Sequence, residues 1–164
     1  MIFVSVGTNE ARFDRLLRAV DELPLDEELV VQHGHSTRIE RPGAELVDFL
    51  SFEGMVETIR RARIVVTHAG VGSVMVSLAN GKCPVVVPRL KSFGEAVDDH
   101  QLQLGRRFAA AGLVTLVEAP DGLAAALARE QQPAAIVPSA SSLAADLTSF
   151  LEHAIPRPLA PAPA

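Results

Sequence analysis

The chain has 164 residues, a formal net charge of −5 and 48% apolar residues, which fits one domain with a substantial core. An acidic chain lacks the basic footprint of sequence-independent nucleic-acid binding, and seven Phe without Trp or Tyr offer no dense stacking platform for single strands. The single cysteine, Cys83, excludes an intramolecular disulfide and a cysteine-based zinc site. We therefore expect no nucleic-acid partner and a reducing, cytoplasmic setting.

Short β-branched runs alternate with amphipathic stretches along the chain, a pattern typical of a parallel sheet with helices on both faces. In chain order we expect a strand at 2–6, a helix at 10–23, strands at 28–32 and 44–49, a helix at 54–62, a strand at 64–67, a helix at 72–80, a strand at 85–88, a helix at 98–111, a strand at 114–117, and helices at 122–129 and 139–154. The pattern predicts a single α/β domain, Rossmann-like, over residues 1–154.

The two ends of the chain carry no membrane signal. Residues 1–8 lack the basic region of a signal peptide, and no run approaches the roughly 18 continuous apolar residues of a membrane span. Residues 155–164 are rich in Pro and Ala and predict a disordered tail. Any membrane role is therefore expected to come through a partner.

The segment from Ile64 to Val74 reads as strand, glycine turn and helix. Glycines at such a junction let backbone N–H groups approach an anion, and the helix N-terminus adds about half a positive charge. Ser73 can cap the helix or donate to a phosphate oxygen. The pair Gly70-x-Gly72 alone is also compatible with a tight turn that binds nothing, and His68 alone is compatible with a structural role.

A second polar cluster lies at residues 93–101, beyond the strand at 85–88. Open α/β sheets bind ligands outside the carboxyl ends of their strands, and Asp, His and Gln side chains suit sugar hydroxyls, which donate and accept hydrogen bonds. The alternative is that Asp98 or Asp99 only caps the following helix.

Together these segments resemble the C-terminal domain of glycosyltransferase family 28. The resemblance rests on HAGVGS at 68–73, GKCPVVVP at 81–88 and DHQ at 99–101, and covers roughly residues 1–117. Further matching segments at 6–21, 48–52 and 89–101 are similar to soluble subunits of two-component, exopolysaccharide-type transferases.

The resemblance implies the C-terminal half of a GT-B glycosyltransferase, in which two Rossmann-like domains face each other across a cleft. This half binds a UDP-sugar, and no metal or other cofactor is implied. A separate membrane-anchored subunit would bind a polyprenyl-diphosphate-linked saccharide, hold the chain at the inner membrane face and supply the general base for inverting hexose transfer. No catalytic base is therefore assigned within this chain.

The same resemblance assigns the donor-binding residues by position. The diphosphate would meet the turn and the end of the first strand, the uracil would meet backbone groups at Phe52, and the hexose would meet the second cluster. The implied donor-binding residues are Gly7, Thr8, Phe52, His68, Gly70, Gly72, Ser73, Asp99, His100 and Gln101.

Two positions depart from the family pattern. Val76 occupies the place where family members usually carry a Glu that would bind the ribose hydroxyls, and Asn9 stands where exopolysaccharide relatives often have His. Val76 keeps open a second interpretation, a non-catalytic partner that stabilises or regulates a transferase. A third, an unrelated nucleotide-dependent enzyme such as an epimerase or dehydrogenase, fits less well because the third glycine of the dinucleotide fingerprint and a catalytic Tyr are absent.

Overall fold

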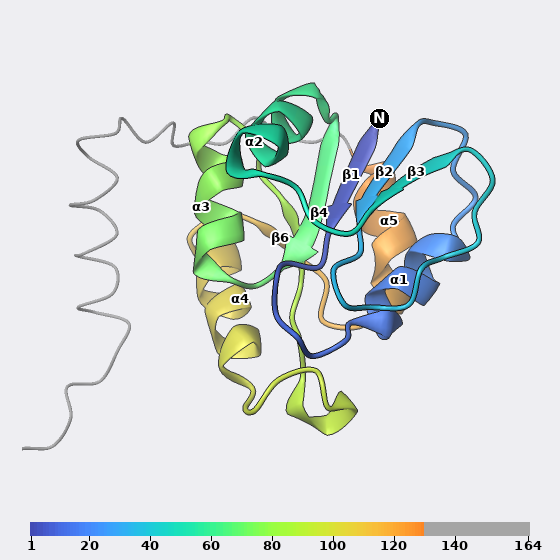
Figure 1. The fold of residues 1–164 in the computed structure, drawn as a ribbon. Coiled ribbons are helices and arrows are strands. Elements are labelled where there is room, and N and C mark those ends of the chain that lie inside the picture. The colour runs from blue at the N-terminus through green and yellow to red at the C-terminus, as the bar shows by residue number, and fades with distance from the viewer. Residues whose placement is uncertain (130–164) are drawn as a thin grey trace, which may run out of the picture.

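The structure is a computed structural model that describes residues 1–129, so the helix predicted at 139–154 and the tail at 155–164 lie outside the described residues. Six parallel strands form one sheet in the order β3-β2-β1-β4-β5-β6 (Figure 1). The strands are β1 (Ile2–Ser5), β2 (Leu29–Gln32), β3 (Ala44–Val47), β4 (Ile64–His68), β5 (Val85–Val87) and β6 (Thr115–Leu116). This is the strand order of a doubly wound nucleotide-binding sheet, which confirms the predicted α/β class.

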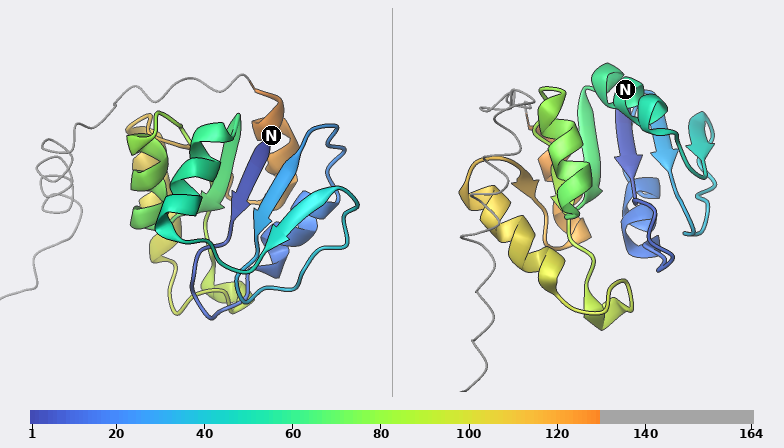
Figure 2. Two further views of the ribbon diagram at one scale, coloured as in Figure 1. Left: turned by 45° about the horizontal axis from the view of Figure 1, so that its top comes forward. Right: turned by 60° about the vertical axis from the view of Figure 1, so that its left-hand side comes forward.

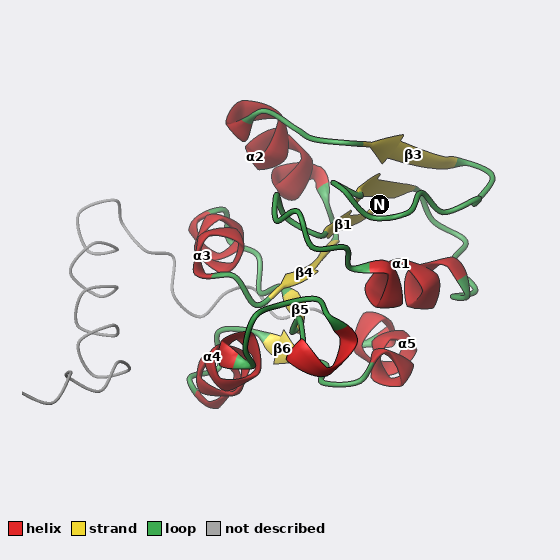
Figure 3. Ribbon diagram, turned by 60° about the horizontal axis from the view of Figure 1, so that its bottom comes forward, coloured by secondary structure: helices red, strands yellow, loops and turns green. Residues whose placement is uncertain are grey.

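Five α-helices cover the two faces of the sheet within residues 1–129, and two short 3₁₀ helices lie in the connections that follow β5 and β6 (Figures 2 and 3). They are α1 (Asp14–Asp21), α2 (Phe52–Arg61), α3 (Val71–Ala79), η1 (Lys91–Phe93), α4 (His100–Ala110), η2 (Pro120–Gly122) and α5 (Leu123–Ala128). Helices α1 and α5 lie on one face, and α2, α3 and α4 lie on the other.

Alternation along the strands divides the core between these faces, because successive side chains of a strand point to opposite sides. In β1, Ile2 and Val4 pack in the same cluster as Leu16 of α1, whereas Phe3 packs with Ile59 of α2. The four central strands are buried on both sides, as expected for a parallel sheet covered by two helical layers, whereas the edge strands β3 and β6 are half-buried.

The boundaries of several elements differ from the prediction, most at the first helix. It begins at Asp14 rather than at residue 10, because the Phe13 N–H donates to Ser36 Oγ at 2.8 Å and the Thr37 N–H to Asp14 Oδ1 at 2.8 Å. It also ends two residues early, at Asp21. Contacts from the loop after β2, which the local pattern does not contain, therefore decide where this helix starts.

The second helix was predicted from residue 54 but begins at Phe52. Ser51 is its N-cap, and its Oγ accepts the Gly54 N–H at 3.1 Å, the usual capping geometry. Most of the remaining boundaries move by one or two residues. Gly81 and Gly112 adopt φ of +74° and +70° after α3 and α4, which confirms both as the residues that end these helices.

Candidate functional site

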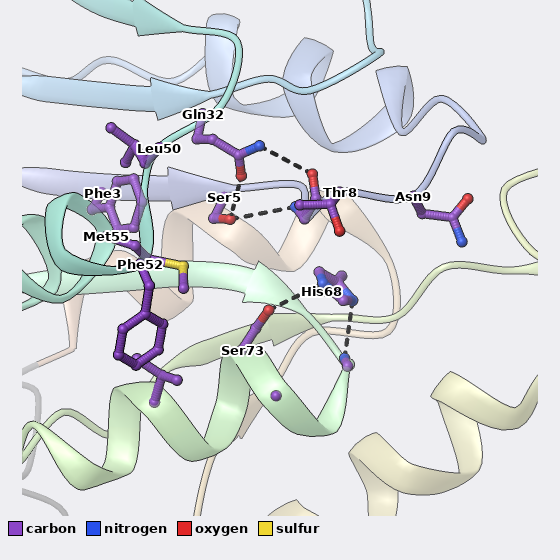
Figure 4. A pocket seen from close by; sticks show the side chains of 14 residues that line it. Phe3, Ser5, Thr8, Asn9, Gln32, Leu50, Phe52, Met55, His68 and Ser73 are labelled. Atoms are coloured by element: carbon purple, nitrogen blue, oxygen red, sulfur yellow. Dashed lines mark hydrogen bonds between the residues drawn. The ribbon is translucent and has the colours of Figure 1, made fainter.

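A cavity of about 660 Å³ opens at the carboxyl ends of β1 and β4 (Figure 4). These two strands are neighbours at the point where the strand order reverses, the position at which open α/β sheets bind ligands. The residues that line the cavity are Phe3, Ser5, Gly7, Thr8, Asn9, Gln32, Leu50, Phe52, Met55, His68, Gly70, Gly72, Ser73 and Val76. One end of this wall is polar and the other is apolar.

The polar end is built around the turn from β4 into α3. Gly70 is the N-cap of α3, and the first amide bonded back to it is the Val74 N–H, which donates to the Gly70 carbonyl at 3.1 Å. The amides before Val74 have no acceptor within the helix, and the helix dipole adds partial positive charge there. Since Gly70, Gly72 and Ser73 line the cavity, this turn is chemically suited to an anion such as a diphosphate.

The His68 ring bridges this turn. Its Nδ1 accepts the Gly70 N–H at 3.0 Å, and its Nε2 lies 3.1 Å from Ser73 Oγ. Because Nδ1 accepts, the proton of the neutral ring is assigned to Nε2, which then donates to Ser73 Oγ. The Ser73 hydroxyl hydrogen is thereby left for another acceptor, such as a phosphate oxygen.

The charge state of His68 follows from its surroundings. Burial, and secondarily the positive charge of Arg89, lower the pKa of His68 to about 4, although a hydrogen bond with Gln101 offsets part of the shift. The ring is therefore neutral at physiological pH and acts through its hydrogen bonds rather than through a charge.

Three glycines around the cavity have different roles. A Cβ on Gly7 would lie 2.4 Å from His68 Nε2, and a Cβ on Gly70 would lie 2.1 Å from His68 Cε1. Gly7 also has φ of +79°, which side chains rarely adopt. A Cβ on Gly72, in contrast, would meet nothing within 4 Å. Gly7 and Gly70 make room for the histidine, whereas Gly72 leaves space in front of the helix end.

A buried polar network supports the floor of the cavity, and the sequence analysis missed it. Ser5 Oγ donates to Gln32 Oε1 at 2.6 Å and accepts the Gly7 N–H at 3.3 Å. Gln32 Nε2 donates to the carbonyls of Gly7 and Asp48, each at 3.0 Å. A polar residue at the last position of each of two adjacent buried strands was the signal that could have revealed it.

Arg89, which follows β5, ties together the loops beside the cavity. Its guanidinium is fully buried and donates to the carbonyls of Val6 at 2.8 Å and Ala11 at 2.6 Å. The Glu95 carboxylate, also buried, pairs with Arg15 at 2.8 Å and accepts the Leu90 N–H at 3.0 Å. These bonds fix the loop after β1 against the loop after β5.

The structure brings together seven of the ten predicted site residues and leaves three outside the cavity wall. Gly7, Thr8, Phe52, His68, Gly70, Gly72 and Ser73 line the cavity. Asp99 and His100 are exposed at the start of α4, where Asp99 Oδ1 accepts the Lys91 N–H at 2.9 Å and Asp98 Oδ1 accepts the His100 N–H at 3.0 Å. Gln101 Oε1 accepts the Arg89 N–H at 3.2 Å. The donor-binding roles of all ten stay predictions.

The apolar end of the cavity lies between α2 and α3 and includes residues that the sequence analysis did not assign. Leu50, Met55 and Val76 pack against the buried cluster that contains Phe3, and Phe52 stands at the rim with 62% of its surface exposed. Val76 thus forms part of the wall itself.

Residues 1–129 contain no group of three or more His, Cys, Asp or Glu side chains arranged to hold a metal ion. Nor does this part of the chain have a helix with the length and apolar character needed to cross a bilayer.

The fold and the cavity define a Rossmann-like domain with a glycine turn, chemically suited to an anion, at the switch point of its sheet. The sequence model of the glycosyltransferase family 28 C-terminal domain matches residues 1–154. The chain belongs to this family.

Individual proteins resemble the chain in sequence or in fold. The UDP-N-acetylglucosamine transferase subunit ALG13 of Eremothecium gossypii is 38% identical over 91 residues, which cover 53% of this chain and 42% of the fungal protein. The calicheamicin glycosyltransferase CalG4 superposes with a TM-score of 0.59 at 18% identity over 94% of this chain and 44% of its own. MurG of Acinetobacter baumannii gives 0.51 at 20% identity over 76% and 39%. These solved structures show the fold, and the chain spans less than half of each of the three proteins.

Proposed function

We propose that the chain is the donor-binding subunit of an inverting glycosyltransferase that moves a hexose from a UDP-sugar to a lipid-linked saccharide in bacterial polysaccharide synthesis. The observation that carries the proposal is the β4–α3 turn, whose glycines, Ser73 and helix N-terminus face the cavity at the switch point. Family membership and the transferase subunit named in the fungal relative support the same activity.

The proposed contribution of the chain to catalysis is electrostatic. As the bond to the anomeric carbon breaks, negative charge grows on the departing nucleoside diphosphate. Hydrogen-bond donors that already point at the position of the developing charge stabilise it best, because they need not reorient during the reaction. Here the first amides of α3 and the Ser73 hydroxyl would do so, with His68 orienting that hydroxyl. A helix N-terminus can perform the task that a divalent ion has in other transferases.

The acceptor hydroxyl must also lose a proton, and His68 is unsuited to accept it. Its pKa of about 4 makes it a weak base, and its Nδ1 is already occupied by the Gly70 N–H. We therefore assign the general base and the acceptor site to a separate membrane-anchored subunit, which would hold this chain at the inner membrane face.

Calorimetric titration of the chain with UDP, followed by an assay with a labelled UDP-sugar and a polyprenyl-diphosphate-linked acceptor, tests the proposal. We expect UDP binding by the chain alone and transfer only after the partner subunit is added. Robust turnover by the chain alone would refute the two-subunit assignment.

A non-catalytic, stabilising role is the second candidate, and it is favoured by the apolar Val76 in the cavity wall. It predicts that the partner's own transfer activity depends on the presence of this chain but not on nucleotide binding by it. A variant that folds and assembles but does not bind UDP separates the two, since it would still support transfer only under the second function.

A further inference from the structure

The cavity wall next to the β4–α3 turn is apolar at the place where a nucleoside would lie if its diphosphate bound at this turn. Ser73 and Val76 are three residues apart on α3 and therefore share one face of the helix, and both line the cavity. From the turn the cavity extends toward Leu50, Phe52 and Met55 (Figure 4). A nucleoside whose diphosphate binds at Ser73 and whose base lies toward this apolar end places its pentose against Val76.

No carboxylate meets the pentose there. The cavity-lining residues within 1–129 include no Asp or Glu. Glu53 and Glu57 of α2 are exposed and line a separate depression that also contains Phe52. A charged acceptor for the 2′-hydroxyl, which dinucleotide-binding sheets of this type provide, is therefore missing from the described wall.

Two neutral polar side chains of the wall, Ser5 and Gln32, are already bonded to each other. The Ser5 hydroxyl donates to Gln32, and both Nε2 hydrogens of Gln32 are donated to backbone carbonyls. Both side chains are also almost completely buried, with 4% and 5% of their surface exposed. Neither can donate to a pentose hydroxyl without breaking the support of the Gly7 loop.

We propose that this site does not select ribose over 2′-deoxyribose, so that 2′-deoxyribonucleoside diphosphate sugars are accepted as donors alongside the ribonucleotide forms. This inference rests on the proposed donor-binding function. A pocket that hydrogen-bonds a hydroxyl rejects the analogue without it, whereas an apolar pocket discriminates weakly. A 2′-hydroxyl beside Val76 finds no hydrogen-bond partner in that side chain and keeps its bond to water in the open cavity, so its removal should change the binding free energy little.

The test compares UDP with 2′-deoxy-UDP, which share the base and the diphosphate, by calorimetry on the full-length chain. We expect the two dissociation constants to agree within about threefold, because an apolar wall discriminates weakly. Val76→Glu supplies the missing carboxylate and should shift the ratio by about tenfold or more toward UDP. Glu53→Gln is the matched control outside the cavity and should leave the ratio unchanged.

The outcomes separate this inference from the proposed function. If the wild-type chain binds UDP at least tenfold more tightly than 2′-deoxy-UDP, the inference is wrong and donor binding stands. If Glu53→Gln abolishes such a preference, Glu53 is the pentose ligand and the inference is equally wrong. If neither nucleotide binds, the donor-binding function fails together with the inference. The wild-type comparison decides the matter even if Val76→Glu does not fold.

Discussion

The turn after β4 and the loop after β5 both follow central strands at the carboxyl edge of the sheet, yet they contribute differently to the cavity. The β4–α3 turn lines it with Gly70, Gly72 and Ser73. The β5–α4 loop sends its buried groups, Arg89 and Glu95, beneath the neighbouring loop and leaves Asp99 and His100 exposed. The difference teaches that a polar cluster at a strand end can support a site without lining it.

The largest effect should come from the buried part of the β5–α4 loop. Arg89→Met leaves the Val6 and Ala11 carbonyls without their donor and removes the buried charge beside Glu95, so it should cost about 3–5 kcal/mol of unfolding free energy. Urea denaturation measures this loss. Arg18→Met, on the exposed side of α1, is the matched control and should change stability by less than about 0.5 kcal/mol. A comparable loss of unfolding free energy in both variants would show that the hydrogen bonds of Arg89 do not contribute more to stability than an exposed arginine does.

The next largest effect should be a dependence of the unfolding free energy on pH that arises from His68. Its pKa is lowered from 6.5 to about 4 in the folded state, so the unfolded chain binds the proton first as pH falls. The stability from the neutral ring is complete above pH 6.5 and is lost progressively down to pH 4, by about 3 kcal/mol in total. Denaturation of the wild type and of His68→Asn across this window should show the extra loss only in the wild type. Direct NMR titration of the ring should give a midpoint near 4, and a midpoint near 6.5 would contradict the assignment.

Substitutions at Gly72 and Gly70 should have different effects, the first on UDP binding and the second on stability. Gly72→Val places a side chain in open space where the anion would bind, and should weaken UDP binding by about 10- to 100-fold, since hydrogen bonds to charged groups contribute about 1.5–3 kcal/mol. Its unfolding free energy should change little. Gly70→Ala instead collides with His68 and should lower stability. Unchanged UDP affinity in folded Gly72→Val would remove the diphosphate from this turn.

The smallest changes in UDP affinity and stability should follow from substitutions on the exposed side of the β5–α4 loop. His100→Ala should change UDP affinity by less than about twofold and stability by less than about 0.5 kcal/mol, because the side chain is exposed and outside the cavity wall. Any loss should appear only with the complete UDP-sugar, whose hexose the resemblance directs toward this loop. Calorimetry with UDP and with UDP-hexose tests this, and an equal loss with both ligands would place His100 at the nucleotide instead.

By itself the sequence determined the element order and the position of the glycine turn between β4 and α3. Both follow from short-range chemistry: β-branched runs make buried strands, and the order strand, Gly70-x-Gly72, helix places free amides at a strand end. The site roles of His68 and Ser73 came from the family resemblance and stay predictions, while the structure places His68 Nε2 3.1 Å from Ser73 Oγ.

Only the tertiary structure decided which residues from other parts of the chain contact and support the region around the turn. Ser5 meets Gln32, 27 residues away, and Arg89 reaches Val6, 83 residues away, and no local pattern encodes such pairs. The start of α1 was equally hidden, because Ser36 and Thr37 set it from another loop. The apolar wall containing Val76 also depends on α2 packing beside α3. These features depend on strand register and helix packing, which act across the fold rather than along the chain.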